Sequence, residues 1–350
     1  MTLDATIDAI AIISGEALDA AEERQNSLTK PPGSLGQLEV VGNKLCAIAG
    51  TCPPPVPAKP LIGLFAGDHG VWAQGVSPWP QEVTVQMALN IASGGAAISV
   101  LGRQLGAQVW VTNVGIASDV PEHPGIRQKL VRRGTRDFSV EPAMTREEAV
   151  AALEVGIATA NEAVDGGADC LLTGEMGIGN TTPASALIAV LTGASIDAVT
   201  GRGAGADDAM LAHKVAVIEQ AIALHGVDRS DPLGLLAAVG GLEHAALAGF
   251  ILGGAARGVP VIVDGVIAAS AALVAVALAP NAAGYLISGH AGMEPGITEA
   301  VSALGLRPLL DLDLRLGEGS GAAMALPIVQ AGARVLGEMA TFDDAGVARG

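Results

Sequence analysis

Residues 168–180 read ADCLLTGEMGIGN, and residues 181–191 continue as TTPASALIAVL. The first stretch begins as a short apolar run, typical of a buried strand, and ends in a glycine-rich loop. Thr181 or Thr182 can cap a following helix, and Pro183 suits its first turn. A strand, a glycine loop and a helix N-terminus in this order favour an anion-binding site, and the alternative is a tight strand–helix turn without a ligand.

The same alternation continues on both sides of this stretch. Other apolar runs end in a glycine-rich or polar loop, and most of them lead into a helical pattern. Because strands that alternate with helices build parallel sheets, we predict a three-layer α/β fold. Its mainly parallel, Rossmann-like sheet carries helices on both faces. The other runs are PLIGLFAGDHG (60–70), AQVWVTNVGI (107–116), LGLLAAVGG (233–241), VPVIVDG (259–265) and AAGYLISGHAG (282–292).

Both ends of the chain lack this alternation. Residues 1–50 read as helical, TCPPPVPAKP at 51–60 is a proline-rich connector, and the C-terminal tail reads as helix again. We therefore predict a large α/β domain over residues 58–308. A small helical domain is expected from residues 1–57 together with residues 309–350.

The composition argues against a nucleic-acid partner and restricts how an anionic substrate would be bound. The net charge is −17, with 19 basic against 36 acidic residues, whereas a nucleic-acid-binding protein needs basic patches. An anionic substrate would have to be held largely by backbone N–H groups. The 47 glycines fit that need, because glycine lets the backbone approach a ligand closely.

The chain shows no sign of export or of a membrane span. MTLDATIDAI at the start has no basic region before an apolar core. The uncharged stretch at 265–280 is shorter than the ~20 residues of a transmembrane helix, so we expect a buried core helix. Cys46, Cys52 and Cys170 form no CxxC or metal-ligand spacing. These features predict a cytoplasmic protein.

Polar side chains gather where the predicted strands end, which is where open α/β sheets bind ligands. Asp68 and His69 could hold a metal ion, but no third ligand stands at a recognisable spacing, so a hydrogen-bonded turn explains them as well. The loop at 287–296, which contains Glu294, leaves the same two alternatives open: a ligand-binding loop or a hydrogen-bonded turn. The strand-end residues are Asp68, His69, Glu175, Asn180, Asp264, Ser288 and His290.

Three charged residues are candidates for catalysis. Glu318 stands between two glycines in LGEGSGA, residues 316–322, where a flexible backbone would let a carboxylate general base approach a ligand. A helix-capping role is the alternative. Glu175 offers a second carboxylate, as in a glycosidase pair, although nothing in the sequence fixes their separation. Lys214 follows a second glycine loop, GRGAGADD, and by itself reads more often as a solvated helix lysine.

Seven segments complete the sequence pattern: LTKPPGSLGQLE (28–39), AGDHGV (66–71), GVSPWPQEVT (75–84), GGAAISVLGRQ (94–104), GEMGIGNTTPASAL (174–187), VPVIVDGVIAASAAL (259–273) and LGEGSGAAMALPIVQA (316–331). In this order they resemble the nicotinate-nucleotide–dimethylbenzimidazole phosphoribosyltransferase family, from about residue 27 to 340. The resemblance implies a parallel α/β fold with a small helical domain from both chain ends. It also implies a cytoplasmic homodimer that acts on small molecules without a cofactor or metal.

The implied reaction moves the phosphoribosyl group of nicotinate mononucleotide to 5,6-dimethylbenzimidazole. The products are α-ribazole 5′-phosphate and nicotinate, on the route to the lower ligand of cobalamin. Nicotinate leaves from a positively charged ring nitrogen and needs no proton, so one base that removes the benzimidazole N–H suffices. By motif, that base corresponds to Glu318, and the family's other functional glutamate and lysine correspond to Glu175 and Lys214.

The resemblance also implies residues that bind the substrates. Contacts to phosphate and ribose are expected from Gly174, Met176, Gly177, Gly203 and Ser288. The base pocket is expected at Trp79, Gln86, Met87 and Leu316. Well-known members place a serine and, eight residues on, a glutamine against the benzimidazole, whereas this chain has Trp79 and Met87 there, with Ser77 and Gln86 out of register. Adenine or a phenol could therefore replace dimethylbenzimidazole. A non-catalytic nucleotide sensor and a nucleotide hydrolase remain alternatives.

Overall fold

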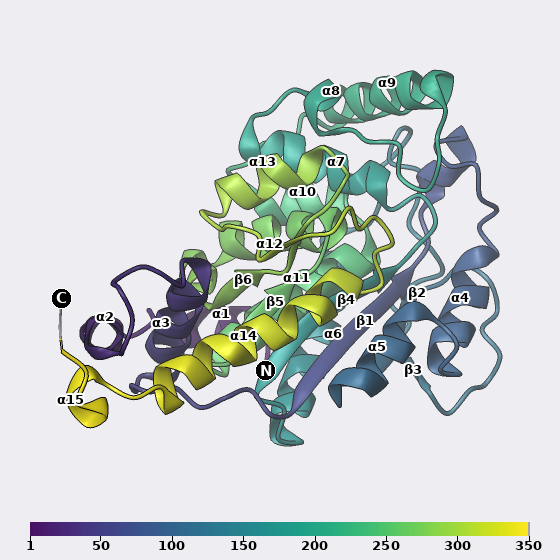
Figure 1. Cartoon of the computed structure of the whole chain (residues 1–350). Coiled ribbons are helices and arrows are strands. Elements are labelled where there is room, and N and C mark those ends of the chain that lie inside the picture. Colours follow the sequence, from purple (N-terminus) through teal and green to yellow (C-terminus); the bar gives the residue numbers. More distant parts are fainter. Residues whose placement is uncertain (349–350) are drawn as a thin grey trace.

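One parallel sheet organises the computed structural model, which describes residues 1–348, and it confirms the predicted α/β fold (Figure 1). The strand order is β3-β2-β1-β4-β5-β6, and every neighbouring pair is parallel. A two-stranded parallel ribbon, β7 with β8, lies outside it. The strands are β1 (Pro60–Gly67), β2 (Gln108–Gly115), β3 (Ile126–Gln128), β4 (Cys170–Met176), β5 (Val261–Val263), β6 (Leu286–Ser288), β7 (His290–Ala291) and β8 (Leu310–Asp311).

Helices cover both faces of the sheet, as the unbroken apolar strands predict. Alternate residues of β1 divide between two cores. Leu61 and Phe65 face α6, α11 and α12, whereas Ile62 and Leu64 face α3, α4, α5 and α14. The helices are α1 (Leu3–Ala9), α2 (Gly15–Ser27), α3 (Gln37–Ala49), α4 (Val83–Ala92), α5 (Ala97–Leu105), α6 (Arg146–Asp165), α7 (Thr181–Thr192), α8 (Ile196–Val199), α9 (Asp208–His225), α10 (Pro232–Val239), α11 (Leu242–Ala256), α12 (Val266–Leu278), α13 (Gly296–Ala303), α14 (Ser320–Glu338) and α15 (Phe342–Ala345), with 3₁₀ turns η1 (Gly70–Gln74) and η2 (Pro280–Tyr285).

Small residues let the helices of one face pack closely. A Cβ added at Gly249 of α11 would lie 1.9 Å from the carbonyl oxygen of Leu153 in α6, and one at Gly156 equally close to that of Ala246. Side chains at either glycine would therefore force the two helices apart. The composition, rich in alanine and poor in aromatic residues, thus allows the backbones of neighbouring helices such as α6 and α11 to approach closely.

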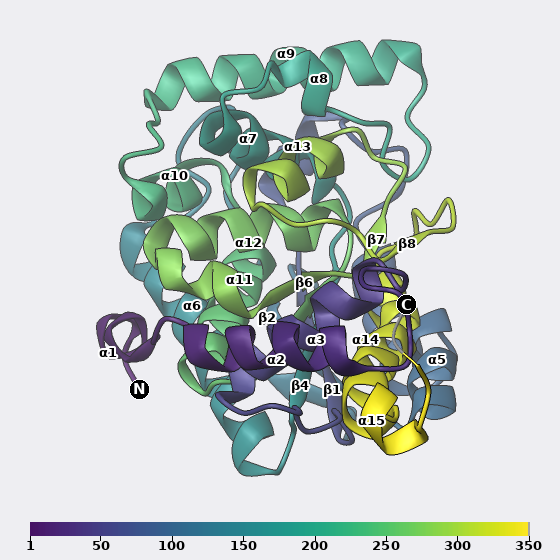
Figure 2. The same cartoon turned by 60° about the vertical axis from the view of Figure 1, so that its left-hand side comes forward.

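The two ends of the chain meet beside the sheet. α2 and α3 pack against α14, and Figure 2 shows these segments side by side near the C-terminus. α14 also lies across β4 and β5, and α1 packs on α6 and α11 of the opposite face. The terminal helices are therefore shared between both faces, and the division into two domains at residues 57/58 and 308/309 remains a prediction.

One expected strand is a helix. LGLLAAVGG at 233–241 forms most of α10, because Asp231 caps its N-terminus through Gly234 N–H and Pro232 occupies its first position. A short apolar run alone does not distinguish a buried strand from a buried helix. The apolar stretch at 265–280 contains the buried helix α12, as predicted.

One stretch of the described residues, Val83–Leu105, has the length and apolarity of a membrane span. Ser93–Ala96 divide this stretch into the helices α4 and α5. About a third of its most apolar part is buried inside the protein. Length and composition alone are weak evidence for a membrane span.

Candidate active site

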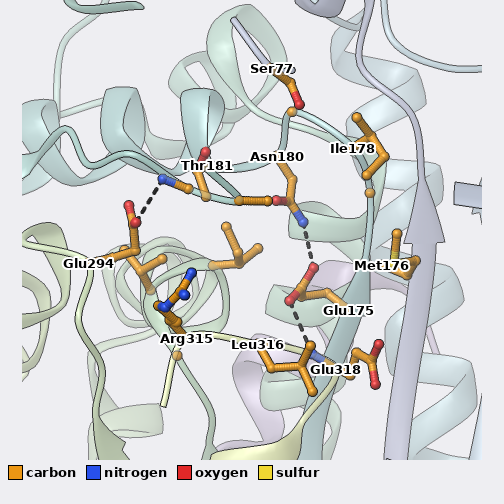
Figure 3. Close-up of a pocket in the computed structure, with 18 of the residues that line it drawn as sticks. Ser77, Glu175, Met176, Ile178, Asn180, Thr181, Glu294, Arg315, Leu316 and Glu318 are labelled. Carbon is orange, nitrogen blue, oxygen red and sulfur yellow. Dashed lines mark hydrogen bonds between the residues drawn. The ribbon is translucent and has the colours of Figure 1, made fainter. Parts of the chain in front are cut away.

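A cavity of about 430 Å³ opens at the carboxyl ends of β4 to β6, where the sequence predicted ligand binding (Figure 3). Its wall combines the loop after η1, the loop from β4 into α7, the glycine loop before α9 and the segment before α14. Segments far apart in the chain thus meet at one edge of the sheet.

Most of the predicted site residues meet in this cavity, and four do not line it. Gln86 is exposed on α4, and Gly174, Lys214 and Ser288 are buried behind the wall. The predicted residues that line it are Trp79, Met87, Glu175, Met176, Gly177, Gly203, Leu316 and Glu318.

Glu175 is the penultimate residue of β4 and lines the cavity, where two groups hold its carboxyl group. Its carboxylate accepts a hydrogen bond from the Asn180 side chain and one of 3.4 Å from the backbone N–H of Glu318. Burial raises the pKa of Glu175 to about 8, and the nearby carboxylates of Asp264 and Glu243 act in the same direction. Glu175 is therefore a group that changes protonation near neutral pH.

Glu318 lies in an uncommon backbone conformation at the start of α14. Its φ is +63°, between Gly317 at +79° and Gly319 at +88°, which accounts for the two flanking glycines. The turn is held by Asp264, whose carboxylate accepts the N–H of Gly319 at 3.1 Å and that of Ala322 at 2.9 Å. A strained position held by buried hydrogen bonds is typical of a functional residue.

The carboxyl group of Glu318 is buried and incompletely bonded. Only 5% of the residue is exposed, and its Oε2 atom has no hydrogen-bond partner. Burial raises the pKa of Glu318, while the backbone N–H of Ile98 opposes that rise. Figure 3 shows this carboxyl group pointing away from that of Glu175. The two glutamates therefore present carboxyl groups in different directions.

Gly174 brings β4 against the Glu318 turn. A Cβ at this position would lie 2.9 Å from the carbonyl oxygen of Glu318. Its contribution in this structure is thus close packing behind the cavity.

Lys214 is not a solvated helix lysine. Only 1% of it is exposed, and its Nζ donates to Thr181 Oγ1 at 2.6 Å and to the Gly201 carbonyl at 3.1 Å. Burial lowers the pKa of Lys214 to about 8, although the Glu294 carboxylate opposes this shift. Because Thr181 lines the cavity at the start of α7, a buried ammonium lies directly behind a helix N-terminus.

The glycine loop before α9 faces this helix N-terminus. The N–H of Gly203 donates to Glu294 Oε1 at 2.8 Å, so a carboxylate occupies an anion position on the loop. Arg202 and Arg315 also line the cavity. Sequence reasoning missed both arginines, because neither belongs to a distinctive motif. Together these groups can hold an anionic substrate.

Apolar side chains form another part of the cavity wall. Trp79 remains 48% exposed, and its indole N–H donates to the Ala204 carbonyl at 2.9 Å. Met87 and Leu316 also line the cavity, as does Ser77, whereas Gln86 does not. A flat aromatic ring could lie against this wall.

An α/β sheet with an apolar wall, a helix N-terminus and buried carboxylates around a cavity at its carboxyl edge is typical of an enzyme that acts on a small molecule. The model of a phosphoribosyltransferase family matches residues 10–347. Nicotinate-nucleotide–dimethylbenzimidazole phosphoribosyltransferase of Salinispora tropica is 55% identical over the full length of both chains. The same enzyme of Chloroflexus aggregans is 53% identical over 99% of this chain and 98% of its own.

A solved structure agrees with these relatives. The crystal structure of nicotinate-nucleotide–dimethylbenzimidazole phosphoribosyltransferase from Thermus thermophilus matches with a TM-score of 0.91 and 44% identity, covering 97% of this chain and 100% of that one. The chain therefore belongs to the nicotinate-nucleotide–dimethylbenzimidazole phosphoribosyltransferase family, and it is a transferase that acts on small molecules.

Proposed function

We propose that this enzyme transfers the phosphoribosyl group of nicotinate mononucleotide to 5,6-dimethylbenzimidazole. The products would be nicotinate and α-ribazole 5′-phosphate, a precursor of the lower ligand of cobalamin. The observation that carries the proposal is the buried Glu318 carboxyl group in the wall of the cavity, with one oxygen free of any hydrogen bond.

The chemistry needs a base and no acid. The nicotinate nitrogen carries positive charge in the nucleotide, so the glycosidic bond breaks without a proton donor. The attacking benzimidazole bonds to the ribose through the ring nitrogen that carries no hydrogen. It must lose the proton of its other ring nitrogen, the N–H, and Glu318 would accept that proton. A carboxyl group whose pKa is raised by burial is a stronger base than an exposed one. Attack opposite the leaving group turns a β-glycoside into an α-glycoside.

The nucleotide would be held at the glycine loops. Its phosphate would meet the N-terminus of α7, with the charge of Lys214 behind Thr181, and would take the place of the Glu294 carboxylate on the N–H of Gly203. Glu175 would then lie between the phosphate site and Glu318, where it would contact the ribose. Gly174 and Ser288, behind the wall, would shape these loops rather than touch the substrate.

Lys214 should contribute to the pH dependence of nucleotide binding, and the Lys214→Met variant separates its contribution from that of Glu175. The Lys214 pKa of about 8 means that the ammonium loses its proton as the pH rises through 8. We expect the KM for nicotinate mononucleotide to rise over this range, and Lys214→Met to have a KM raised roughly tenfold, the scale of one charge interaction of ~1.4 kcal/mol. KM profiles from pH 6.5 to 9.5 check this, with the exposed Lys59→Met as control. A variant with the same KM and the same profile as wild type would contradict it.

Trp79 should help to bind the acceptor base. Trp79→Ala removes the aromatic wall, and we expect the KM for dimethylbenzimidazole to rise about tenfold, since stacking on an aromatic side chain contributes roughly 1–3 kcal/mol. Trp79→Phe keeps an aromatic ring in the wall, although it loses the hydrogen bond to Ala204, and should change this KM little. Equal KM values for both variants and wild type would place the base elsewhere.

We further propose that the enzyme is a homodimer. We also propose that it lies in the cytoplasm, and three free cysteines with no disulfide among the described residues are consistent with that compartment. The function itself is tested by following nicotinate release from nicotinate mononucleotide with dimethylbenzimidazole, adenine, phenol or no acceptor. Transferase activity predicts release only when an acceptor is present. Release without an acceptor would indicate a hydrolase, and binding without any release would indicate a sensor.

A further inference from the structure

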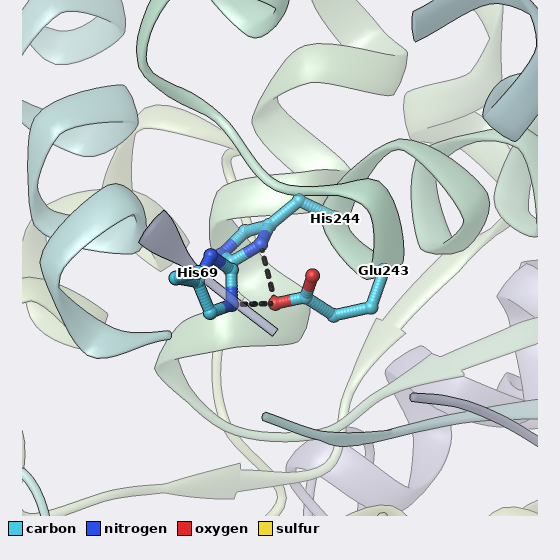
Figure 4. A group of neighbouring side chains, drawn as sticks. All are labelled: His69, Glu243 and His244. Atoms are coloured by element: carbon cyan, nitrogen blue, oxygen red, sulfur yellow. Dashed lines mark ion pairs between the residues drawn. The ribbon is translucent and has the colours of Figure 1, made fainter. Parts of the chain in front are cut away.

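Three side chains outside the cavity form a fully buried cluster. His69 follows β1, and Glu243 and His244 lie in the first turn of α11 (Figure 4). His69 Nε2 and His244 Nδ1 lie 2.8 Å and 2.9 Å from the same carboxylate oxygen, Glu243 Oε1. The sequence offered no third ligand beside Asp68 and His69, because the other two residues are brought there only by the fold.

These short contacts are buried ion pairs that lack the alignment of hydrogen bonds (Figure 4). All nitrogen and oxygen atoms of the three side chains lack a hydrogen-bond partner, so neither ring N–H is aligned with Glu243 Oε1 despite the distance. Buried polar groups without partners are rare and call for an unseen water or ion. Two nitrogens close to an oxygen but aimed past it are expected when all three atoms point toward a common centre.

The donor set and the spacing both fit a metal ion. Around an octahedral ion with ligand distances near 2.1 Å, neighbouring donor atoms are about 3.0 Å apart, close to the two observed separations. Two imidazoles and one carboxylate suit divalent transition metals such as zinc, iron or cobalt, whereas magnesium and calcium prefer oxygen ligands. The three donor atoms lie within 4.8 Å of one another.

We propose that His69, Glu243 and His244 bind one divalent transition-metal ion. The ion ties the loop after β1 to the N-terminus of α11. The far nitrogens, His69 Nδ1 and His244 Nε2, bond to buried water, as they have no partner among the described residues.

The site supports the cavity without belonging to it. None of the three residues lines the cavity, so the ion does not touch the substrates. A Cβ at Gly177, which does line it, would lie 3.2 Å from His69 Nε2 and 3.5 Å from Glu243 Oε1. The metal thus lies directly behind the loop that connects Glu175 to the anion-binding helix, and its function is to hold that loop in place.

Metal content of the full-length, tag-free protein tests the proposal. After purification without chelator and removal of loose metal, mass spectrometry should find about one equivalent of a transition metal per chain. Apo protein titrated with Co²⁺ should develop d–d absorption that saturates near one equivalent, and its Tm should rise with Zn²⁺ concentration. Wild-type protein that takes up no metal and shows no change in Tm overturns the proposal.

Variants identify the ligands independently of activity. Glu243→Gln and His244→Leu should weaken Co²⁺ binding by at least roughly 100-fold and remove the absorption bands. His123→Ala, which removes a ring that contacts Ser93 instead, should bind cobalt as wild type does. Cobalt spectra unchanged in both cluster variants would overturn the assignment, and because the readout is metal binding, it does not depend on the proposed transferase reaction.

Discussion

Replacing Glu318 by glutamine should lower kcat by about 10²–10⁴-fold, the usual contribution of a general base. Glutamine keeps the shape of the side chain but cannot accept a proton. The wild-type kcat should increase as the pH rises through the raised pKa of Glu318, because only the ionised carboxylate acts as a base. In the variant this dependence should be absent. Steady-state kinetics with nicotinate mononucleotide and dimethylbenzimidazole over pH 4.5–8 measure both effects.

The same substitution should not unfold the protein. Burial penalises the ionised carboxylate, so a neutral amide should leave the Tm unchanged or slightly higher. Glu338→Gln is a matched control at the far end of α14, the helix that Glu318 precedes, where the side chain is exposed and paired with Arg334. Its kcat should equal that of wild type. A Glu318→Gln enzyme with kcat within about threefold of wild type would exclude Glu318 as the base.

Replacing Asp264 by alanine should damage both stability and catalysis. Its buried carboxylate accepts two N–H groups at the start of α14, and hydrogen bonds to a charged group contribute ~1.5–3 kcal/mol each. We expect a loss of about 3–5 kcal/mol in the free energy of unfolding. We also expect kcat to fall roughly 10–100-fold, because the neighbouring Glu318 turn loses its anchor. Urea titration and steady-state kinetics measure the two losses.

The pH profile separates an electrostatic effect of Asp264 from a structural one. Its carboxylate raises the pKa of Glu318 and of Glu175, so its removal should move the acid limb of the kcat profile to lower pH. Asp231→Ala is the matched control, since Asp231 caps α10 at a half-exposed position. That cap should contribute only ~1 kcal/mol and leave kcat unchanged. Equal stability losses in the two variants would contradict the anchoring role of Asp264.

The fold could be predicted from the sequence where apolar runs, glycines and helix caps all indicate the same element. Short apolar runs followed by glycines and helix caps identified the strands that build the sheet, and the parallel order followed from their alternation with helices. The same logic failed at residues 233–241, where a short apolar run without periodicity is compatible with a strand or a helix. The Asp231 cap before it identifies the helix. The resemblance to the family added the reaction, but the strand ends already indicated the binding edge.

The candidate site was only partly predictable, for a physical reason. Glu318 and Glu175 stand in glycine-framed loops that are visible in the sequence. The burial of Lys214 depends on the packing of α9 over α7, and the meeting of His69 with Glu243 and His244 depends on the packing of α11 on the sheet. Contacts between elements distant in the chain leave no local pattern, so the sequence could not reveal them.

The configuration of the product tests the proposed transfer most directly. Nuclear magnetic resonance of the product from nicotinate mononucleotide and dimethylbenzimidazole should show an α-configured riboside 5′-phosphate, formed in equal amount with nicotinate. This outcome follows from attack opposite the leaving group by one ring nitrogen of the benzimidazole, while the N–H proton of its other ring nitrogen passes to Glu318. A β-configured riboside, or ribose 5-phosphate in place of a riboside, would contradict the proposed reaction.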